Sequence, residues 1–472
     1  MKVLSVASEI YPQIKTGGLA DVVGALPAAL AAHGVETLSL VPGYPAIKRA
    51  VEGRTSASLE LLGQPVGLVR GRAAGLDILM LDCPALFDRE GGPYTDAEGL
   101  DWPDNWLRFA VLGRAALAVA EGAVEGFEPD LVHAHDWQAA LAPVYLAYAG
   151  RPCPSVMTVH NIAFQGQFAQ TIFSRLGLPG AAMNIDGVEY YGDVGYLKGG
   201  MQLADAVTTV SPTYAEEIRQ PRFGMGLEGV VAARGDAVHG IVNGIDVEAW
   251  NPAEDAALPS RYDAKHLARR KANRAALAEE FGLTDDGPLF CVITRLTWQK
   301  GMDVLVQAID GLVGRGGRLA VLGSGDAELE AAFQAAAERH QGRVGLFLGY
   351  SEPLAHRLQG GADAILIPSR FEPCGLTQLY GLRYGCVPVV ARTGGLADTV
   401  IDANAAALNA GVATGIVFDE VEDASLLRAI DRSVALFAQP KTWQRMMRNG
   451  MSSDVSWERS AAAYAALYKS LV

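Results

Sequence analysis

KTGGLADVV at residues 15–23 and RTGGLADTV at residues 392–400 decide the fold of this chain of 472 residues. In both copies a cationic residue, Thr, two glycines and Ala-Asp recur in the same order. Each copy follows an apolar, strand-like run, at 3–8 and 386–391, and precedes a helix-like stretch. A Gly-Gly turn after a strand lets backbone N–H groups approach an anion, and the following helix adds the positive end of its dipole. The repeat therefore predicts two similar α/β domains facing one cleft, a geometry that suits joining an anionic donor to a second substrate.

Short apolar runs alternate with helical patterns through the first part of the chain. The strand-like runs lie at 3–8, 37–43, 77–82, 130–136 and 155–161, and the helical patterns lie at 19–33 and around 105–122. This alternation is typical of an α/β fold with a parallel, doubly wound sheet, in which ligands bind beyond the carboxyl ends of the strands. The polar residues of KTGGLAD, HAHDW and TVHN come just after such runs.

The same alternation starts again after GIVNGID at 240–246. The later strand-like runs lie at 288–296, 318–326, 344–350, 364–369, 387–392 and 415–418, and the final segment, 455–472, has a helical pattern. We therefore expect an N-terminal domain of residues 1–241 and a C-terminal domain of residues 242–455. Both substrates must enter an open cleft and react in a dry one, so we expect the domains to close about hinges near 240–250 and 450–456.

Composition narrows the class of protein. The net charge of -14 argues against a nucleic-acid binder, whose footprint would be basic, so a phosphate-bearing substrate must be held by a few local Arg and Lys residues. The five cysteines are scattered without CxxC spacing, which indicates reduced thiols in a cytoplasmic protein. The apolar run near the N-terminus is too short for a signal peptide, and no apolar stretch reaches the length of a membrane span.

Two segments of the second domain carry candidate phosphate-binding residues. Arg295 and Lys300 lie in TRLTWQKG directly after a buried run, where two cations can neutralise a diphosphate, although an ordinary surface pair has the same spacing. In SRFEPCGLTQL, Gly375-Leu376-Thr377 could open a helix whose free N–H groups meet phosphate, and Glu372 could accept from sugar hydroxyls. The alternative for Glu372 is an acid that only stabilises the helix start.

Other candidates carry weaker signals. His160 and Asn161 end a strand, where a lone histidine is more often a structural hydrogen-bonding residue than a catalytic one. His133 and His135 face the same side of their strand without a third ligand nearby, and the chain has no Asp-x-Asp pair, so no metal site is predicted. The aromatic and acidic loop at 93–106 could bind sugar or simply be pinned by its tryptophans. Tyr350 could stack on a base or be a strand-end aromatic.

The motifs taken together resemble one family. KTGGLADV, HAHDW, TVHNIAFQG, VSPTYA, NGID, TRLTWQKG, SRFEPCGLTQL and RTGGLADTV occur in the order seen in bacterial glycogen synthases and plant starch synthases, over essentially the whole chain. The resemblance implies a GT-B fold whose last helix, 456–472, packs back on the first domain. It also implies transfer of glucose from ADP-glucose to the non-reducing end of an α-1,4-glucan with retention, without metal or cofactor. Tyr380 stands where broader nucleotide-sugar transferases carry a second Glu, a departure that this family shares.

The resemblance also assigns roles to residues. Arg295 and Lys300 resemble the pair that neutralises the departing diphosphate, and Glu372 resembles the residue that grips the donor glucose. His160 resembles the residue whose carbonyl lies beside the anomeric carbon while its imidazole holds the glucose 6-hydroxyl. The remaining donor-side residues are Lys15, Gly18, Asp21, Asn161, Asn243, Tyr350 (on adenine), Cys374, Gly375, Leu376 and Thr377. The acceptor-side residues are Glu9, Tyr94 and Asp136.

Three alternatives remain open from sequence. An α-glucan phosphorylase would need pyridoxal phosphate on a lysine and a much longer chain. A glucan- or nucleotide-binding regulator could keep the fold without turnover. UDP-glucose is the chief rival donor, because the residues identify a diphosphate and a hydroxylated sugar but not the base. The sequence leaves the oligomeric state undecided.

Overall fold

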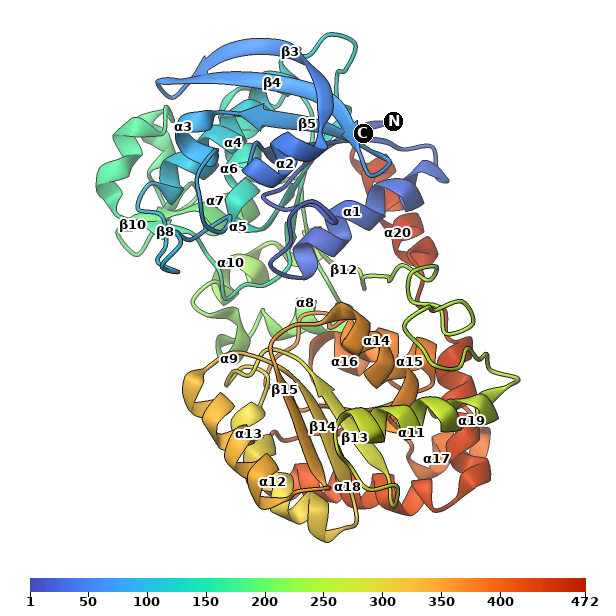
Figure 1. Ribbon diagram of the computed structural model, residues 1–472. Helices are drawn as coiled ribbons and strands as arrows, with labels where there is room; N and C mark the ends of the chain where they lie inside the picture. The colour runs from blue at the N-terminus through green and yellow to red at the C-terminus, as the bar shows by residue number, and fades with distance from the viewer. The chain divides into compact units, whose positions relative to one another are not determined.

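The computed structural model describes residues 1–472, and the chain forms two compact units (Figure 1). Unit 1 consists of Met1–Asn243 together with Trp457–Val472, and unit 2 is Gly244–Ser456. The chain therefore passes into unit 2 after Asn243 and returns to unit 1 after Ser456. None of its helices has the length and apolar character that crossing a membrane requires.

Unit 1 is built on a nine-stranded sheet, in which the strands from β12 to β5 are parallel and β5, β4 and β3 are antiparallel. In spatial order the strands are β12 (Val238–Gly240), β11 (Ala206–Thr209), β7 (Ser155–Val159), β6 (Leu131–His135), β1 (Lys2–Val6), β2 (Glu36–Pro42), β5 (Leu76–Asp82), β4 (Gln64–Ala73) and β3 (Glu52–Leu61). A separate small sheet holds β8 (Gln167–Phe168), β10 (Asp193–Gly195) and β9 (Glu189–Tyr190).

The antiparallel edge of this sheet corrects the purely parallel arrangement expected from sequence. β3 lies at the sheet edge and is exposed along most of its length, so its sequence, EGRTSASLEL, is not an apolar run. The turns Leu62–Gly63 and Ala74–Gly75 have positive φ at both residues, as two-residue hairpin turns that match strand twist require. The sequence feature that could have predicted these strands is therefore the glycine-containing turn that joins them, and not an apolar run.

Helices cover both faces of the unit 1 sheet. Its helices are α1 (Gly18–Ala31), α2 (Pro45–Ala50), α3 (Pro84–Phe87), α4 (Asn105–Ala120), α5 (Asp136–Ala139), α6 (Leu141–Tyr148), α7 (Tyr196–Leu203), α8 (Pro212–Glu217), α9 (Pro221–Gly224), α10 (Glu228–Ala233) and α20 (Glu458–Leu471). The last helix, α20, packs beside α1 and buries Tyr464 and Tyr468 against Val3 and Leu131 of the sheet. Residues spaced by three and four along α20 form this apolar stripe.

Unit 2 has a six-stranded sheet that is parallel throughout. Its strands, in spatial order, are β15 (Val344–Leu348), β14 (Arg318–Gly323), β13 (Leu289–Ile293), β16 (Ala364–Ile367), β17 (Val387–Ala391) and β18 (Ile416–Phe418). Its helices are α11 (Arg270–Glu280), α12 (Met302–Gly314), α13 (Ala327–Arg339), α14 (Glu352–Gly361), α15 (Thr377–Tyr384), α16 (Gly394–Thr399), α17 (Ala405–Ala410), α18 (Asp423–Phe437) and α19 (Pro440–Ser452).

Both faces of this second sheet are buried. Phe290 and Val292 of β13 pack in the core that contains residues of α12 and α18, whereas Leu289 and Cys291 pack in the core that contains residues of α11 and α14. A strand buried on both faces reads as a continuous apolar run. This is why PLFCVITRL and its counterparts predicted the strands of unit 2 from sequence.

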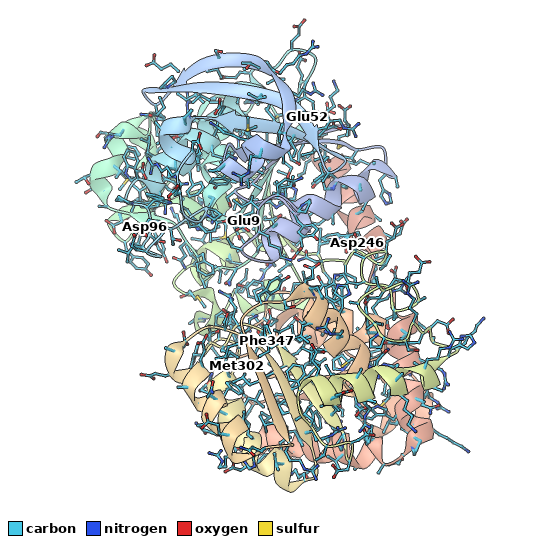
Figure 2. All side chains as sticks on the ribbon, viewed as in Figure 1. Glu9, Glu52, Asp96, Asp246, Met302 and Phe347 are labelled. Carbon is cyan, nitrogen blue, oxygen red and sulfur yellow. The ribbon has the colours of Figure 1, made fainter.

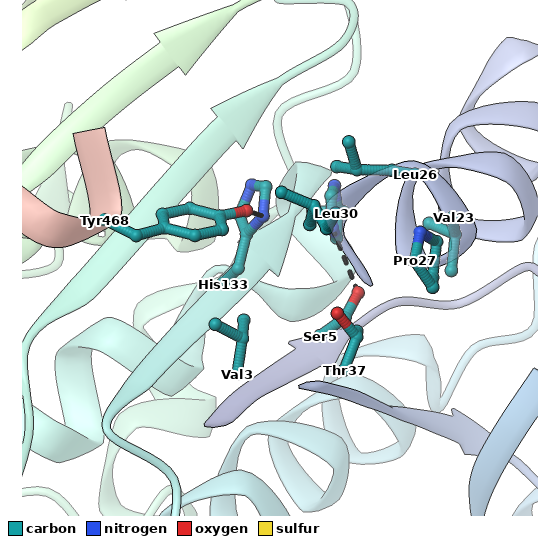
Figure 3. Close-up of a pocket in the computed structure, with 10 residues that line it drawn as sticks. Val3, Ser5, Val23, Leu26, Pro27, Leu30, Thr37, His133 and Tyr468 are labelled. Carbon is teal, nitrogen blue, oxygen red and sulfur yellow. Dashed lines mark hydrogen bonds between the residues drawn. The ribbon is translucent and has the colours of Figure 1, made fainter. Parts of the chain in front are cut away.

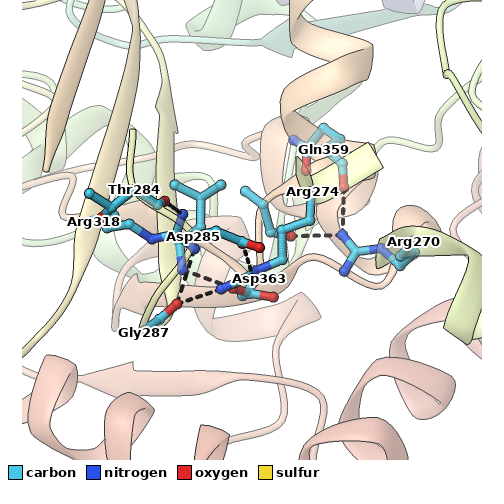
Figure 4. A network of polar contacts seen from close by, with 10 residues as sticks. Arg270, Arg274, Thr284, Asp285, Gly287, Arg318, Gln359 and Asp363 are labelled. Atoms are coloured by element: carbon cyan, nitrogen blue, oxygen red, sulfur yellow. Dashed lines mark hydrogen bonds and ion pairs between the residues drawn. The ribbon is translucent and has the colours of Figure 1, made fainter. Parts of the chain in front are cut away.

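A buried polar network fixes the amino ends of the unit 2 strands (Figure 4). Asp363, just before β16, accepts hydrogen bonds from the backbone N–H of Leu289 at 2.8 Å and from Nε of Arg274 at 3.0 Å. Arg318, the first residue of β14, is fully buried and donates to the carbonyl oxygens of Thr284 and Gly287. These contacts lie at the edge of the sheet opposite the carboxyl ends, where ligands of α/β folds bind.

Candidate active site

The two cations predicted in unit 2 follow β13, but only one of them has a partner. Lys300 forms an ion pair with Glu372, its Nζ lying 2.6 Å from Oε2, and Ser369 Oγ donates to the same oxygen at 2.9 Å. Both side chains of the pair are largely buried. The guanidinium of Arg295 is exposed and makes no hydrogen bond or ion pair. Unit 2 therefore brings Lys300 and Glu372 together and leaves Arg295 as an uncompensated charge.

Arg370 ties these two loops together, and the sequence reasoning missed it. Its guanidinium pairs with both oxygens of Asp303, at 2.6 and 2.7 Å, and its backbone N–H donates to the carbonyl of Gln299 at 2.9 Å. The Arg370 guanidinium lies 4.4 Å from the centre of the Trp298 ring. A bidentate Arg–carboxylate pair is geometrically demanding, so it holds the loop of Lys300 against the loop of Glu372. In the sequence, the feature that could have indicated Arg370 is its position directly before Phe371-Glu372.

The loop that follows Glu372 leads into a helix, as its sequence predicted. Gly375 has φ of +71°, and a Cβ there would meet Oε1 of Gln378, so glycine suits this position. α15 begins at Thr377 with Leu376 as its N-cap. The first N–H groups of a helix have no intrahelical acceptor, and they carry the positive end of the helix dipole. Cys374 is buried, so its thiol lies under this loop rather than on the surface.

The second Gly-Gly turn has a structural role that differs from the anion-approach role expected from sequence. A Cβ at Gly394 would overlap the carbonyl oxygen of Glu372, and a Cβ at Gly395 would overlap that of Cys374. The N–H of Gly395 donates to the carbonyls of Glu372 and Pro373, each at 3.1 Å. Because these glycines have no Cβ, the start of α16 can pack directly against the backbone of the loop that carries Glu372.

The first Gly-Gly turn, in unit 1, is open. A Cβ at Gly17 or Gly18 would have no heavy atom within 4 Å. α1 begins at Gly18, and Lys15 pairs with Asp21 in its first turn at 2.7 Å. The space that the sequence predicted for an anion is present at this copy.

Glu9, labelled in Figure 2, organises the loop before α1. Its carboxylate accepts hydrogen bonds from the backbone N–H and, at 2.6 Å, the hydroxyl of Thr16. It also accepts from the hydroxyl of Tyr94, which lies 2.8 Å from Ser8 Oγ. Glu9 and Tyr94, both predicted on the acceptor side, are therefore in direct contact, and the carboxylate is already engaged in holding the loop.

Asp136 and His160 are also in contact. Asp136 follows β6 with φ of +54°, and its Oδ1 accepts the backbone N–H of His160 at 2.6 Å. The N–H of Asn161 points to the same oxygen at 3.4 Å, and Asn161 Oδ1 accepts from the N–H of Ala163. Burial raises the pKa of Asp136 to about 7. The left-handed backbone is strained for a non-glycine residue, and it places the carboxylate where it orients the turn after β7.

A buried chain of side chains leads to the imidazole of His160. His160 Nε2 lies 3.0 Å from His135 Nδ1, and His135 Nε2 lies 3.2 Å from Ser5 Oγ. Burial lowers the pKa of His160 to about 3 and that of His135 well below its usual value, so both rings are neutral at neutral pH. Each neutral ring has one donor and one acceptor nitrogen, so the proton position on His135 sets the one on His160.

His133 connects the same layer to the last helix. The rings of His133 and His135 lie 4.0 Å apart, which confirms that both face one side of β6. His133 Nδ1 lies 2.7 Å from the Tyr468 hydroxyl, beside a cavity of about 10 Å³ that Ser5 and Thr37 also line (Figure 3). The cavity is far too small for a substrate, so this layer supports the site from within. Sequence reasoning weighed these histidines as metal ligands, rejected that role and assigned them no hydrogen-bonding role.

Two further predicted residues stand apart from these groups. Asn243 is buried, and its Oδ1 has no hydrogen-bond partner, so it offers an unused acceptor. Tyr350 follows β15, is 74% exposed, and lies with its hydroxyl 3.0 Å from Glu352. No group of three or more His, Cys, Asp or Glu side chains that could hold a metal ion is present.

Comparisons with known proteins identify the family. Residues 2–233 match the starch synthase catalytic domain family, and residues 273–450 match glycosyl transferases group 1. The glycogen synthase of Novosphingobium aromaticivorans is 61% identical over 100% of this chain and 99% of its own length. Glycogen synthase 1 of Rhizobium radiobacter is 59% identical with the same coverage.

Solved structures agree with this assignment. The catalytic domain of starch synthase IV from Arabidopsis thaliana, in a structure bound to ADP and acarbose, is 31% identical, with a TM-score of 0.86 and 99% of each chain covered. Sucrose-phosphate synthase from Thermosynechococcus elongatus, 17% identical with a TM-score of 0.59, covers 100% of this chain with 98% of its own and shares the fold. The two Rossmann-like units confirm the GT-B fold expected from sequence, and the chain belongs to the glycogen and starch synthase family of glycosyltransferases.

Proposed function

We propose that this chain transfers glucose from ADP-glucose to the non-reducing end of an α-1,4-glucan with retention of anomeric configuration. The observation that carries the proposal is the Lys300–Glu372 ion pair together with the unpaired Arg295, all of which follow the carboxyl ends of unit 2 strands. The names of the full-length relatives and the ADP in the starch synthase IV structure support the reaction and the base.

The donor is held by an exchange of partners at the unit 2 loops. Without donor, Glu372 compensates the charge of Lys300 at 2.6 Å. A diphosphate brought to Arg295 and the first turn of α15 competes for the Lys300 ammonium. Glu372 is then free to accept hydrogen bonds from donor glucose hydroxyls. The buried Lys300 charge is then paired in both states, by Glu372 without donor and by the diphosphate when donor is bound.

Catalysis then depends on positioning and on stabilising the leaving diphosphate. The cations and helix N–H groups meet charge that develops as the glycosidic bond breaks, where preorganised electrostatics are most effective. His160, neutral because burial lowers its pKa to about 3, contributes its backbone carbonyl beside the anomeric carbon and its imidazole to the 6-hydroxyl. Retention without an enzymic nucleophile implies attack on the same face through an oxocarbenium-like state.

The remaining unit 1 residues act around the two substrates. We assign the open turn at Gly18, with the Lys15–Asp21 pair, and the acceptor atoms of Asn161 and Asn243 to the donor side. Tyr94 and Asp136 are assigned to the acceptor side, with Glu9 holding Tyr94 in place. We also place the enzyme in the cytoplasm, because its five free, buried cysteines suit a reducing compartment.

The first test measures glucose incorporation into glycogen from ADP-glucose and UDP-glucose in parallel, with and without EDTA. Incorporation from ADP-glucose alone, unaffected by EDTA, is the expected result. Incorporation from UDP-glucose alone would overturn the donor, and none from either would favour a binding protein. Pyridoxal absorbance in the pure protein would point to a phosphorylase.

A second test addresses the residues. We expect Lys300→Ala and Arg295→Ala each to lower turnover by roughly two to three orders of magnitude, as the loss of one preorganised charge contact does. Lys441→Ala, which removes an exposed cation from α19 of the same unit, is the matched control and should be silent. Glu372→Gln should lower turnover while leaving the protein folded. Full activity in the Lys300 or Arg295 variant would refute the assigned role.

A further inference from the structure

We propose that unit 1 holds a second anion site, for a phosphate dianion or the phosphate group of a small ester, in a pocket formed by Tyr44, Arg49, Arg89 and Arg108. The pocket has a volume of about 140 Å³. It lies where β2 and β5 end, because Tyr44 follows β2 and the chain from Phe87 to Pro93 follows β5. Carboxyl ends of parallel strands are the usual ligand-binding edge of α/β sheets.

Arg108 is buried and makes no ion pair of its own. The carboxylate that acts on its charge, Asp104, is already bound by Arg89. The residue is 1% exposed, and its guanidinium donates only to neutral oxygens: the carbonyls of Leu86 and Pro93 at 2.8 and 2.9 Å, and Oδ1 of Asn105 at 2.7 Å. Burial lowers its pKa, as expected of an ion taken out of water. Buried charges are normally paired, so Arg108 at the pocket wall favours a negative ligand.

The rim adds a second unpaired cation. Arg89 is compensated by Asp104, with which it makes hydrogen bonds at 2.9 and 2.6 Å. Arg49 is exposed at the pocket and makes no hydrogen bond or ion pair. Two of the three guanidiniums around the pocket therefore lack a carboxylate, and no acidic residue lines it. This basic spot is local, because the whole chain carries a net charge of -14.

Tyr44 supplies a buried hydroxyl with no partner. The residue is 3% exposed, its ring packs edge-on against Phe87 at 5.7 Å, and its hydroxyl makes no hydrogen bond. Burial raises the pKa of this phenol, so the hydroxyl remains protonated and can donate at neutral pH. A buried polar group without a partner is disfavoured, and a ligand oxygen in the pocket would satisfy it.

The lining chemistry identifies the ligand class. The polar side chains of the pocket are three guanidiniums, which only donate, and one phenol, so an anion fits better than a neutral sugar, which also needs acceptors. Guanidinium groups match the oxygen geometry of phosphate. The volume accommodates a phosphate with a small substituent but is below the range of pockets for nucleotide-sized ligands. All residues that line the pocket belong to unit 1, so they are distinct from the proposed donor residues of unit 2.

The test is calorimetric titration of the full chain with inorganic phosphate and, separately, with glucose 6-phosphate. Saturating ADP is present throughout, so that phosphate binding at the donor residues does not contribute. We expect one further site, weakened about tenfold or more by Tyr44→Phe and by Arg49→Gln, each of which removes one hydrogen bond to a charged ligand. Arg54→Gln removes an exposed cation of β3 and should bind as the wild type does.

Three results would overturn the proposal: no further site for either probe, unchanged binding in both pocket variants, or equal weakening by Arg54→Gln. Tighter binding of glucose 6-phosphate than of phosphate would identify an ester as the ligand, and equal binding would identify the free anion. Tyr44→Phe keeps the ring against Phe87 and removes only the unpartnered hydroxyl. Its ligand-free unfolding temperature should therefore equal or exceed that of the wild type, which separates loss of binding from loss of fold.

Discussion

The two copies of the TGGLAD motif should respond oppositely to the same substitution. Gly18 and Gly395 occupy the same place in the two copies. Gly395→Ala places a methyl group against the backbone that carries Glu372 and Cys374, whereas Gly18→Ala places one in open space. We expect Gly395→Ala to destabilise unit 2 and Gly18→Ala to leave unit 1 as stable as before or slightly more stable.

The magnitude follows from the contacts. An alanine Cβ at position 395 would lie 2.6 Å from the Cα and the carbonyl carbon of Cys374, whereas carbons in ordinary contact are about 3.5–4.0 Å apart. The loop must therefore shift by about 1 Å, and such overpacking destabilises by about 1–3 kcal/mol. A displacement of about 1 Å at catalytic groups lowers turnover about 100-fold. At Gly18, the first residue of α1, alanine is favoured by up to about 1 kcal/mol of helix propensity.

Differential scanning calorimetry of the two variants and the wild type measures the stability difference, and glucose incorporation into glycogen measures turnover. Stability is the decisive readout, because the first turn is assigned to the donor side and the second supports the Glu372 loop, so we expect both variants to lose activity. If Gly395→Ala unfolds at the wild-type temperature, the second turn does not support the Glu372 loop. If Gly18→Ala is destabilised as much as Gly395→Ala, the steric contrast between the copies is wrong.

Two further predictions concern stability. Because the pKa of His160 is about 3 when folded and about 6.5 when unfolded, its contribution is complete above the unfolded pKa and is lost as pH falls, by roughly 2 kcal/mol between about pH 7.5 and pH 5. Urea unfolding of His160→Gln should show that much less acid destabilisation, and an unchanged pH slope would contradict this. Asp363→Ala leaves the buried N–H of Leu289 and the Nε–H of Arg274 without their acceptor and should cost about 3 kcal/mol in urea unfolding. Asp285→Ala, which removes a 66% exposed partner of the same arginine, should cost under about 1 kcal/mol, and equal losses would refute the role given to burial.

The strands could be predicted from sequence wherever both of their faces are buried. The strands of unit 2 and the first strands of unit 1 are largely buried, and their apolar runs were recognised to within a few residues. β3 and β4 were missed, because a strand at an exposed edge alternates and carries polar residues. Their signal lay in the glycines at 63 and 75, whose positive φ permits the tight turns.

The sequence selected candidate site residues one by one, but it could not show which of them contact each other. Strand-end position selected Lys300 and Glu372, yet spacing in sequence does not show that they neutralise each other across 72 residues. Likewise, identical letters in the two TGGLAD copies concealed one open turn and one packed turn. Packing distances between loops decide such differences, and they depend on which strands the sheet makes neighbours.

In unit 1, a histidine to which the sequence assigned no role in the reaction, His135, controls the proton position on one to which it did, His160. From sequence, His135 was noted as a strand-end residue and rejected as a metal ligand. Its two nitrogens lie between Ser5 and His160, so each proton position on His135 allows only one proton position on His160. The chain of bonds stays neutral because the rings are buried. In the proposed reaction His160 meets the donor glucose through its carbonyl and its imidazole, and a neutral ring does so without adding a charge. The burial of these rings therefore bears on the proposed chemistry as well as on stability.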